Sequence, residues 1–385
     1  MNVPKLRFKE FNKEWKKEKF KQFSYYSGKR NKNNLSLIPY AITNINGFVP
    51  QNEAHNEFGY MKNTNREAYN IVTPKSFAYN PARINVGSIG YYNGTEDIIV
   101  SSLYEVFKTT DYIDDNFLWF WLKSNKLSIW INKLQEGSVR QYFYYDKLCE
   151  TPLYFPNINE QIKISKLLSL LDKKIELQTR KIEDLKLFKK GLINHIIENI
   201  EIEKIPLKYI LVEQNNKTSK NNEYEILSST SKGIYLQKDY FNKQAASDNN
   251  VGYKILKKNQ LVLSPQNLWM GNINVNTEYN IGIVSPSYKI FNISNNVNID
   301  FFNYWIKSPK ALFEYKISSE QGASIVRRNL NMDLFYEIIV DVPRGKLQNK
   351  VGKIIKLLNL NIQYNEFLLQ KLSELKKGLM QNMFV

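Results

Sequence analysis

The chain has few residues at spacings that would support enzymatic chemistry. Its two histidines, His55 and His195, lie 140 positions apart (195 − 55) without cysteine partners, which argues against a zinc site. Glu183-Asp184-Leu185-Lys186 offers the carboxylates and lysine of a nuclease, but it lies in a stretch of helical periodicity, where such charges usually form a solvated face. We therefore predict no catalytic residue and no metal site in this chain.

Two further segments are weak matches to cofactor-binding loops. Asn80-Pro81-Ala82-Arg83 begins like the Asn/Asp-Pro-Pro-aromatic motif of amino-methyltransferases but lacks the second proline and the aromatic residue. Val86-Gly87-Ser88-Ile89-Gly90 has closely spaced glycines but is more typical of a turn beside a strand. The sequence has no Gly-x-x-x-x-Gly-Lys-Ser/Thr loop, so we expect neither an ATP-driven motor nor a cofactor bound by this chain.

The composition indicates a folded protein with a polyanionic partner. Of 385 residues, 43% are hydrophobic and the net charge is +17, which makes nucleic acid the first candidate. The single cysteine, Cys149, allows no internal disulfide and fits a reducing compartment. The N-terminal segment lacks an apolar core and no run of about 18 apolar residues occurs, so we expect neither a signal peptide nor a membrane span and place the chain in the cytoplasm.

A long helical segment occurs twice and organises the chain. The first copy runs over 156–192 and the second over 343–379, and both ends give an offset of 187 (343 − 156 and 379 − 192). Apolar residues at spacings of four and three form the stripe of a coiled-coil seam in each copy. The stripe residues are Ile164, Leu168, Leu171, Ile175, Ile182, Leu185 and Leu192, and then Val351, Ile355, Leu358, Ile362, Leu369, Leu372 and Leu379. We predict that the two helices pack on each other; the alternative is two amphipathic helices on separate cores.

The segment before each helix has the pattern of a mixed α/β domain. Strand-like runs at Leu37–Ile42, Ala68–Thr73 and Ile98–Phe107 alternate with turns rich in Asn and Gly, and Phe117–Leu122 begins a buried helix. The segment after the first helix repeats part of this layout at offsets of 187 and 184, while the middles of the two segments hardly match.

The predicted fold class is therefore mixed α/β, with an internal pseudo-two-fold repeat. Two similar globular domains are separated by two long antiparallel coiled-coil helices. The predicted boundaries are 1–155 for the first domain, 156–200 for the central helix, 201–342 for the second domain and 343–385 for the C-terminal helix.

With these features the whole chain resembles the specificity (S) subunit of type I restriction–modification systems. The opening Val3-Pro4-Lys5-Leu6-Arg7-Phe8, followed by Glu14-Trp15, is similar to a common start of that family. Gly137-Ser138-Val139-Arg140, and more loosely Gly322–Arg327, look like its Gly-Ser-x-Arg element. The helices look like its conserved regions, although the second copy has Leu347 in place of Glu160 and Asn359 in place of Asp172.

The resemblance implies a non-catalytic DNA recognition subunit. Each domain would be a target recognition domain that reads one half of a bipartite double-stranded DNA sequence, and the helices would dock two methyltransferase (M) subunits. Two restriction (R) subunits could join, and S-adenosylmethionine, ATP and Mg would bind in those partner subunits. The alternatives are a stand-alone DNA methyltransferase or nuclease, and a structural coiled-coil adaptor that binds nucleic acid.

Candidate DNA-contacting residues are basic and amide side chains in predicted loops, since phosphates are bound by Lys and Arg and bases by Arg, Asn and Gln. In the first domain they are Lys29, Arg30, Lys32, Arg66 and Arg140, and in the second Lys217, Lys220, Gln266, Asn267, Arg327 and Arg328. Arg140 and Arg327 recur at an offset of 187, which would suit either DNA contact or a shared structural turn.

The centre of each helical stripe carries an amide. Gln178 and Asn365 interrupt the two stripes at their midpoints. If the helices pack antiparallel over their full length, these amides face each other, satisfy each other's hydrogen bonds and fix the register. We predict this contact as the centre of a molecular ruler that sets the gap between two half-sites.

Overall fold

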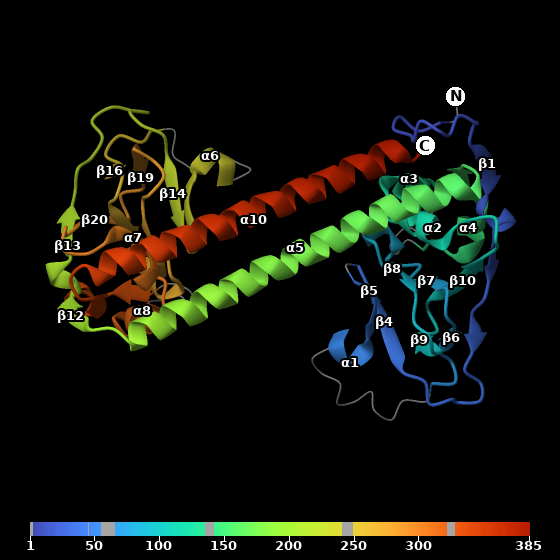
Figure 1. The fold of residues 1–385 in the computed structure, drawn as a ribbon, viewed down its shortest axis with the longest axis horizontal. Helices are drawn as coiled ribbons and strands as arrows, with labels where there is room; N and C mark the ends of the chain where they lie inside the picture. Colours follow the sequence, from blue (N-terminus) through green and yellow to red (C-terminus); the bar gives the residue numbers. More distant parts are fainter. Residues whose placement is uncertain (1–2, 45, 55–65, 135–141, 241–248, 322–327) are drawn as a thin grey trace. The chain divides into compact units, whose positions relative to one another are not determined.

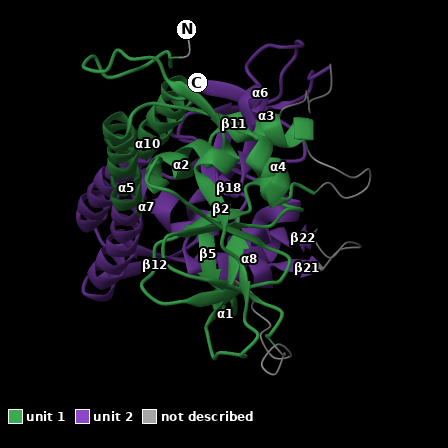
Figure 2. Ribbon diagram, turned by 90° about the vertical axis from the view of Figure 1, so that its right-hand side faces the viewer, with its two compact units in different colours: residues 1–179, 367–385 green, residues 180–366 purple. Residues whose placement is uncertain are grey.

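The computed structural model describes residues 3–385 except 45, 55–65, 135–141, 241–248 and 322–327. The chain divides into two compact units, residues 1–179 with 367–385 and residues 180–366 (Figure 2). Helices and strands are interspersed in both units, so the predicted mixed α/β class is confirmed. The predicted domains 1–155 and 201–342 each fall inside one unit.

Two long helices contribute to both units. α5 (Ile158–Glu198) and α10 (Leu347–Met383) are the longest elements of the chain (Figure 1). Residues 158–179 of α5 belong to the first unit together with residues 367–383 of α10, and the rest of each helix belongs to the second unit. α5 therefore begins in the first unit and ends in the second, whereas α10 begins in the second unit and ends in the first.

The predicted helical stripes face inward. Ile164, Leu168, Ile182, Val351, Ile355 and Ile362 are buried, and the remaining stripe residues are half-buried. In the second unit Lys189 contacts Asn359 while Lys186 contacts Glu366, so the residue number rises in α10 as it falls in α5. The predicted antiparallel coiled-coil pairing is confirmed.

The first unit contains a four-stranded sheet of order β2-β10-β7-β8 and a five-stranded sheet of order β3-β6-β9-β4-β5. Its strands are β1 (Lys16–Lys19), β2 (Ser24–Tyr26), β3 (Lys29–Arg30), β4 (Pro39–Thr43), β5 (Gly47–Pro50), β6 (Asn70–Val72), β7 (Ser76–Tyr79), β8 (Ile89–Tyr92), β9 (Ile98–Val100), β10 (Glu105–Thr109) and β11 (Pro152–Phe155). Its shorter helices are α1 (Gln51–Ala54), α2 (Asp115–Leu122), α3 (Asn125–Leu134), α4 (Tyr145–Glu150) and the 3₁₀ helices η1 (Phe20–Gln22) and η2 (Ile84–Val86).

The second unit repeats the four-stranded sheet as β13-β20-β17-β18, the same order of corresponding strands. Its strands are β12 (Ile202–Pro206), β13 (Leu211–Gln214), β14 (Leu227–Thr230), β15 (Gly233–Leu236), β16 (Lys254–Lys257), β17 (Leu261–Leu263), β18 (Ile273–Val275), β19 (Ile281–Val284), β20 (Lys289–Ile293), β21 (Ser319–Gln321), β22 (Arg328–Leu330) and β23 (Ile339–Pro343). Its shorter helices are α6 (Gln237–Tyr240), α7 (Ile299–Trp305), α8 (Pro309–Ile317), α9 (Met332–Tyr336) and the 3₁₀ helices η3 (Leu207–Tyr209) and η4 (Pro265–Met270).

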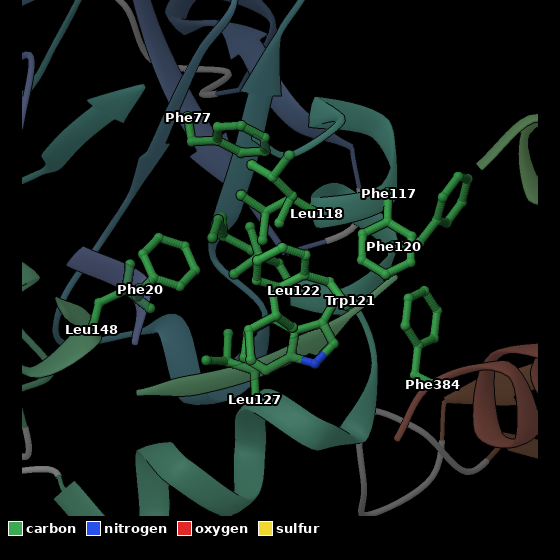
Figure 3. Close-up of a cluster of buried hydrophobic side chains, with 14 of the residues drawn as sticks. Phe20, Phe77, Phe117, Leu118, Phe120, Trp121, Leu122, Leu127, Leu148 and Phe384 are labelled. Carbon is green, nitrogen blue, oxygen red and sulfur yellow. The ribbon is translucent and has the colours of Figure 1, made fainter. Parts of the chain in front are cut away.

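The core of the first unit is aromatic and is completed by the C-terminal end of α10. Asp114 caps the N-terminus of α2, where its carboxylate accepts a hydrogen bond from the Phe117 backbone N–H, and the helix buries most of its side chains. Phe384 packs against Phe117 with ring centroids 5.3 Å apart, and both lie in the cluster drawn in Figure 3. The predicted buried helix at Phe117–Leu122 is confirmed.

The second unit is completed in the same way by the end of α5. Ile193 is fully buried in the second core, with Ile196 and Ile197 packed against that core. The last two of these residues lie 187 positions before Met383 and Phe384, which are buried in the first core. The repeat seen in the sequence is therefore also a repeat of packing.

One predicted strand is wrong. Ile98–Phe107 forms two strands, β9 and β10, which belong to different sheets. A turn separates them, in which the Tyr104 N–H donates to the Ser101 carbonyl at 3.0 Å. The turn was concealed in the sequence because it carries apolar residues, including Leu103, which is 73% exposed.

Candidate nucleic-acid interface

Two of the predicted DNA contacts, Arg30 and Lys217, occupy the same backbone position in the two units. Both are exposed and lie 187 positions apart. Arg30 on β3 pairs with Asn70 of β6, and Lys217 forms a bridge with Lys254 of β16. The residue after each one donates its backbone N–H to a tyrosine carbonyl at 2.9 Å. The structure thus presents a cation at the same sheet edge of each unit.

The other first-unit candidates that the structure describes cluster around that edge. Lys29 and Lys32 are exposed, and Arg66 is half-buried in the segment that leads into β6. Arg30 also has a structural role, because its guanidinium donates to the carbonyls of Ala68 and Ser102 at 2.6 and 3.1 Å. Lys220 of the second unit is exposed in the loop that follows β13.

A second group gathers around η4. Gln266 is exposed and Asn267 half-buried on this 3₁₀ helix. The Arg328 guanidinium of β22 lies over the Trp269 ring, 5.8 Å from its centroid. Arg328 Nε is buried and makes no hydrogen bond among the described residues. Three predicted contacts therefore meet at one loop.

Arg140 and Arg327 lie outside the described residues, so their predicted DNA contacts stay predictions. The segments that follow them are described. Phe143, three positions after Arg140, donates its backbone N–H to the Pro81 carbonyl at 3.1 Å. Arg328, directly after Arg327, contacts the η4 loop, as described above.

The sequence analysis missed Arg83 as a candidate. Arg83 is exposed and lies at the start of η2, the first-unit counterpart of η4. At the offset of 184 it corresponds to Asn267 (267 − 83). The pairs Pro81/Pro265 and Gly87/Gly271 have the same offset and would have identified this loop in the sequence.

A half-buried lysine supports each of these loops. Lys307 Nζ donates to the carbonyls of Gly271 at 2.8 Å and Ser231 at 3.1 Å. Lys123, its counterpart at an offset of 184, donates to the carbonyls of Gly87 and Asn44 at 3.4 and 3.3 Å. Burial lowers the pKa of Lys307 to about 8, and burial together with nearby Lys376 lowers the pKa of Lys123.

Comparison with known proteins decides the family of the first half. Residues 5–187 match the family model described as the type I restriction modification DNA specificity domain. These residues form a type I DNA specificity domain. The match covers the first globular domain and most of α5.

The specificity-subunit fold extends over the whole chain. The fold is similar to that of the S subunit of a type I restriction–modification system from M. genitalium, with a TM-score of 0.59, 14% identity and coverage of 100% of this chain and 99% of that chain. A chain from a structure of the type I system described for complex assembly and conformational transition gives a TM-score of 0.54 at 10% identity, covering 95% of this chain and 96% of that chain.

The chain therefore has the domain and the fold of a type I specificity subunit. The match of residues 5–187 and the similarity in fold agree with the resemblance seen in the sequence. The two competing functions, a stand-alone methyltransferase or nuclease and a structural adaptor, are not favoured by these matches.

The two long helices carry a repeated polar contact. Lys189 Nζ donates to Asn359 Oδ1 at 2.6 Å, and Lys376 pairs with Asp172. The two lysines are 187 positions apart, and so are Asp172 and Asn359. Each lysine also lies over an aromatic ring of its own unit, Tyr304 at 5.6 Å or Phe120 at 5.5 Å from the ring centroid.

The predicted register contact between Gln178 and Asn365 stays a prediction, because the two residues belong to different units. Asn365 is buried, as predicted for a seam residue, and its amide donates to the Asn361 carbonyl and to Asn361 Oδ1, each at 2.7 Å. Its neighbour Glu366 pairs with Lys186, about two helical turns beyond Gln178 in α5.

The described part of the chain contains no cluster of three or more His, Cys, Asp or Glu side chains that could hold a metal ion. His195 is exposed at the end of α5, and His55 lies outside the described residues. Among the described helices, none is both long and apolar enough to cross a membrane.

Proposed function

We propose that this chain recognises a bipartite double-stranded DNA target, with one half-site read by each unit. It would dock two methyltransferase subunits through its helices, and restriction subunits would join that assembly in the cytoplasm. S-adenosylmethionine, ATP and Mg would bind in the partner subunits. This chain would select the sequence on which those subunits act.

The observation that supports the proposal is a repeated framework with different exposed side chains. The corresponding sheets have the same strand order, and the half-buried lysines, Lys123 and Lys307, hold the corresponding loops. The residues at equivalent positions of those loops differ, with Arg83 in one unit and Asn267 in the other. Two recognition domains for different half-sites need such a combination, because the scaffold must place a loop while its side chains select the bases.

The charge supports a DNA partner. The net charge of +17 favours association with the phosphate backbone and makes that association dependent on salt. Arg30 and Lys217 place a positive charge at one repeated edge position, which suits phosphate contacts that orient each unit without selecting a sequence.

The test is co-expression with the neighbouring reading frames, followed by purification and mapping of methylated adenine at base resolution. We expect a bipartite methylated sequence and no methylation by the purified chain alone. Replacement of residues 206–342 by the same region of a relative should change one half-site only. Both ends of this segment lie at the two-stranded β12–β23 sheet, where Glu203 pairs with Val342, so the exchange preserves the connection.

A changed second half-site with an intact first half-site would support one unit per half-site. Simultaneous change of both halves would contradict it. Methylation by the chain alone, removed by a point substitution within it, would contradict the non-catalytic role.

A further inference from the structure

The two units contain the same loop at corresponding places. In the first unit the loop connects β7 to β8 and includes η2, and in the second it connects β17 to β18 and includes η4. Each loop has a proline at its start and ends at a glycine of positive φ, Gly87 at 91° and Gly271 at 83°. Only glycine adopts this conformation without strain, so both loops close in the same way.

Equivalent backbone hydrogen bonds close the two loops. Asn80 N–H donates to the Ser88 carbonyl at 3.0 Å, and Ser264 N–H donates to the Asn272 carbonyl at 3.0 Å. Each pair of partners is related by the offset of 184. The backbone of the loop is therefore a constant feature of the repeat.

The inner side of each loop is fixed by burial. Ile84 and its counterpart Leu268 are 4% and 0% exposed and belong to the cores of their units. Lys123 and Lys307 donate to the glycine carbonyl at the end of each loop, from the residues after α2 of the first unit and after α7 of the second. A loop held by a buried apolar residue and a half-buried cation keeps its shape when its outer side chains change.

The outer side of each loop is chemically different. In order along the loop, the residues of the first unit are Ala82, Arg83, Asn85 and Val86, and those of the second are Gln266, Asn267, Trp269 and Met270. Val86 and Met270, both apolar, remain 55% and 41% exposed. Arg can bind guanine through O6 and N7, Asn and Gln can bind adenine through N6 and N7, and an exposed apolar side chain can contact the thymine methyl group.

Each loop also lies beside the segment that follows the recurrent arginine of its unit. Phe143 donates to the Pro81 carbonyl in the first unit. In the second unit Arg328 lies over Trp269 and has a buried Nε without a hydrogen-bond partner among the described residues. A cation next to the loop can bind a phosphate while the loop side chains reach the base edges.

We infer that these two loops, residues 82–86 and 266–270, are base-reading elements, and that their outer residues determine which half-site each unit accepts. The inference rests on the proposed function and adds the specificity-determining residues. Arg83 is the principal base contact of the first loop, and Gln266 and Asn267 are those of the second.

The experiment exchanges the outer residues and leaves the supporting ones in place. One variant of the complete complex carries Ala82→Gln, Arg83→Asn, Asn85→Trp and Val86→Met, and the reciprocal variant carries the first-unit residues at 266, 267, 269 and 270. Methylated adenines are mapped for both. We expect each variant to change only the half-site of the altered unit and to bind the original target at least about tenfold more weakly.

A matched control exchanges two exposed apolar residues elsewhere at the same offset. Ile129 on α3 and Phe313 on α8 are 60% and 62% exposed, so Ile129→Phe and Phe313→Ile should leave both half-sites unchanged. The single variants Arg83→Asn and Asn267→Arg provide the same test if a fourfold variant does not assemble. Each should change the base preference within one half-site.

The outcomes separate the loop assignment from the proposed function. If the unaltered complex methylates no bipartite sequence, the proposed function fails. If the unaltered complex does so and the assembled loop variants keep the original sequence at unchanged affinity, the loop assignment is wrong.

Discussion

Arg7 binds Glu160 through two hydrogen bonds, from Nε to Oε1 at 2.7 Å and from a terminal guanidinium nitrogen to Oε2 at 2.8 Å. Trp15 Nε1 also donates to Oε1 at 3.3 Å. Glu160 is fully buried at the start of α5. The N-terminal motif thus supplies hydrogen-bond donors to this buried carboxylate.

This contact explains a difference between the two helices. The position that corresponds to Glu160 in α10 is Leu347, which is 37% exposed. The opening motif occurs once, before the first domain, so the second helix has no repeat of the Arg7 and Trp15 donors. Leu347 is exposed, so this position of α10 holds no buried charge that would need such donors.

Glu160→Gln should destabilise the first unit by about 3–5 kcal/mol, because a buried ion pair loses one partner and the Arg7 charge keeps only part of its hydrogen bonds. Chemical denaturation of the purified chain measures the loss. Glu374→Gln on α10 is the control, since its pair with Lys371 is exposed and should contribute little to stability. Equal effects of the two substitutions would contradict a structural role for the buried pair.

Lys307 should make the stability of the second unit depend on alkaline pH. Burial lowers its pKa to about 8 in the folded state, whereas an unfolded lysine titrates near 10.4. The unfolded chain therefore binds more protons between these values, so this residue's contribution to stability rises as pH increases from about 8 to about 10.4. Partial exposure and two carbonyl acceptors that favour the charged form reduce the gain to about 1–2 kcal/mol.

The difference in unfolding free energy between the original chain and Lys307→Met isolates this contribution. The original chain should gain stability relative to the variant across that pH range. Lys208→Met, at an exposed lysine paired with Glu337, serves as the control. A difference that stays constant from pH 7.5 to 10.5 would show that Lys307 keeps an ordinary pKa in the folded chain.

Asn359→Asp should strengthen the contact with Lys189, because it reproduces the Asp172–Lys376 pair of the other unit. We expect a gain of about 0.5–1 kcal/mol, and a comparable loss for Asp172→Asn, since a partly exposed pair of this kind contributes modestly. Thermal unfolding of both variants at low and high salt measures the effect, which should decrease as salt screens the charges. Stabilisation of equal size in 1 M salt would argue against an ionic origin.

Lys217→Ala should reduce the salt dependence of DNA binding by the assembled complex. Loss of one phosphate contact lowers the slope of log K against log salt concentration by about 0.9, with little change in sequence preference. Lys208→Ala removes an equal charge that is already paired with Glu337, so its slope should change less. An altered half-site with an unchanged slope would instead make Lys217 a base contact.

Deletion of one matched heptad from each helix, residues 175–181 and 362–368, should shorten the gap between the methylated half-sites. Seven residues at 1.5 Å each remove about 10 Å, or about three base pairs. Both deletions lie between the Asp172–Lys376 and Lys189–Asn359 contacts, so these contacts are retained. They also remove Gln178 and Asn365. Deletion from one helix only should prevent assembly, and an unchanged gap in the double deletion would refute the ruler.

The sequence by itself determined the helices and the repeat, and it indicated a polyanionic partner. The stripe of Ile164, Leu168 and their equivalents needs only a count of spacings, because apolar periodicity sets which helix face is buried. The excess of Lys and Arg requires no structure either, since net charge acts at long range. The helix at Phe117–Leu122 was evident because a short run so rich in aromatic residues has to be buried.

Tertiary structure alone decided which residues share a surface. The strand partners of Arg30 and Lys217 showed that these two residues occupy equivalent positions. The packing of β22 beside η4 showed that Gln266 and Arg328 belong to the same region. Arg83 was missed because Asn80-Pro81-Ala82-Arg83 was considered only as a methyltransferase motif. In the structure Arg83 lies on a loop that Lys123, which follows α2, supports through hydrogen bonds. Spacing along the chain specifies local structure, but a recognition surface is assembled by contacts between segments far apart in sequence, and those depend on packing that no local pattern encodes.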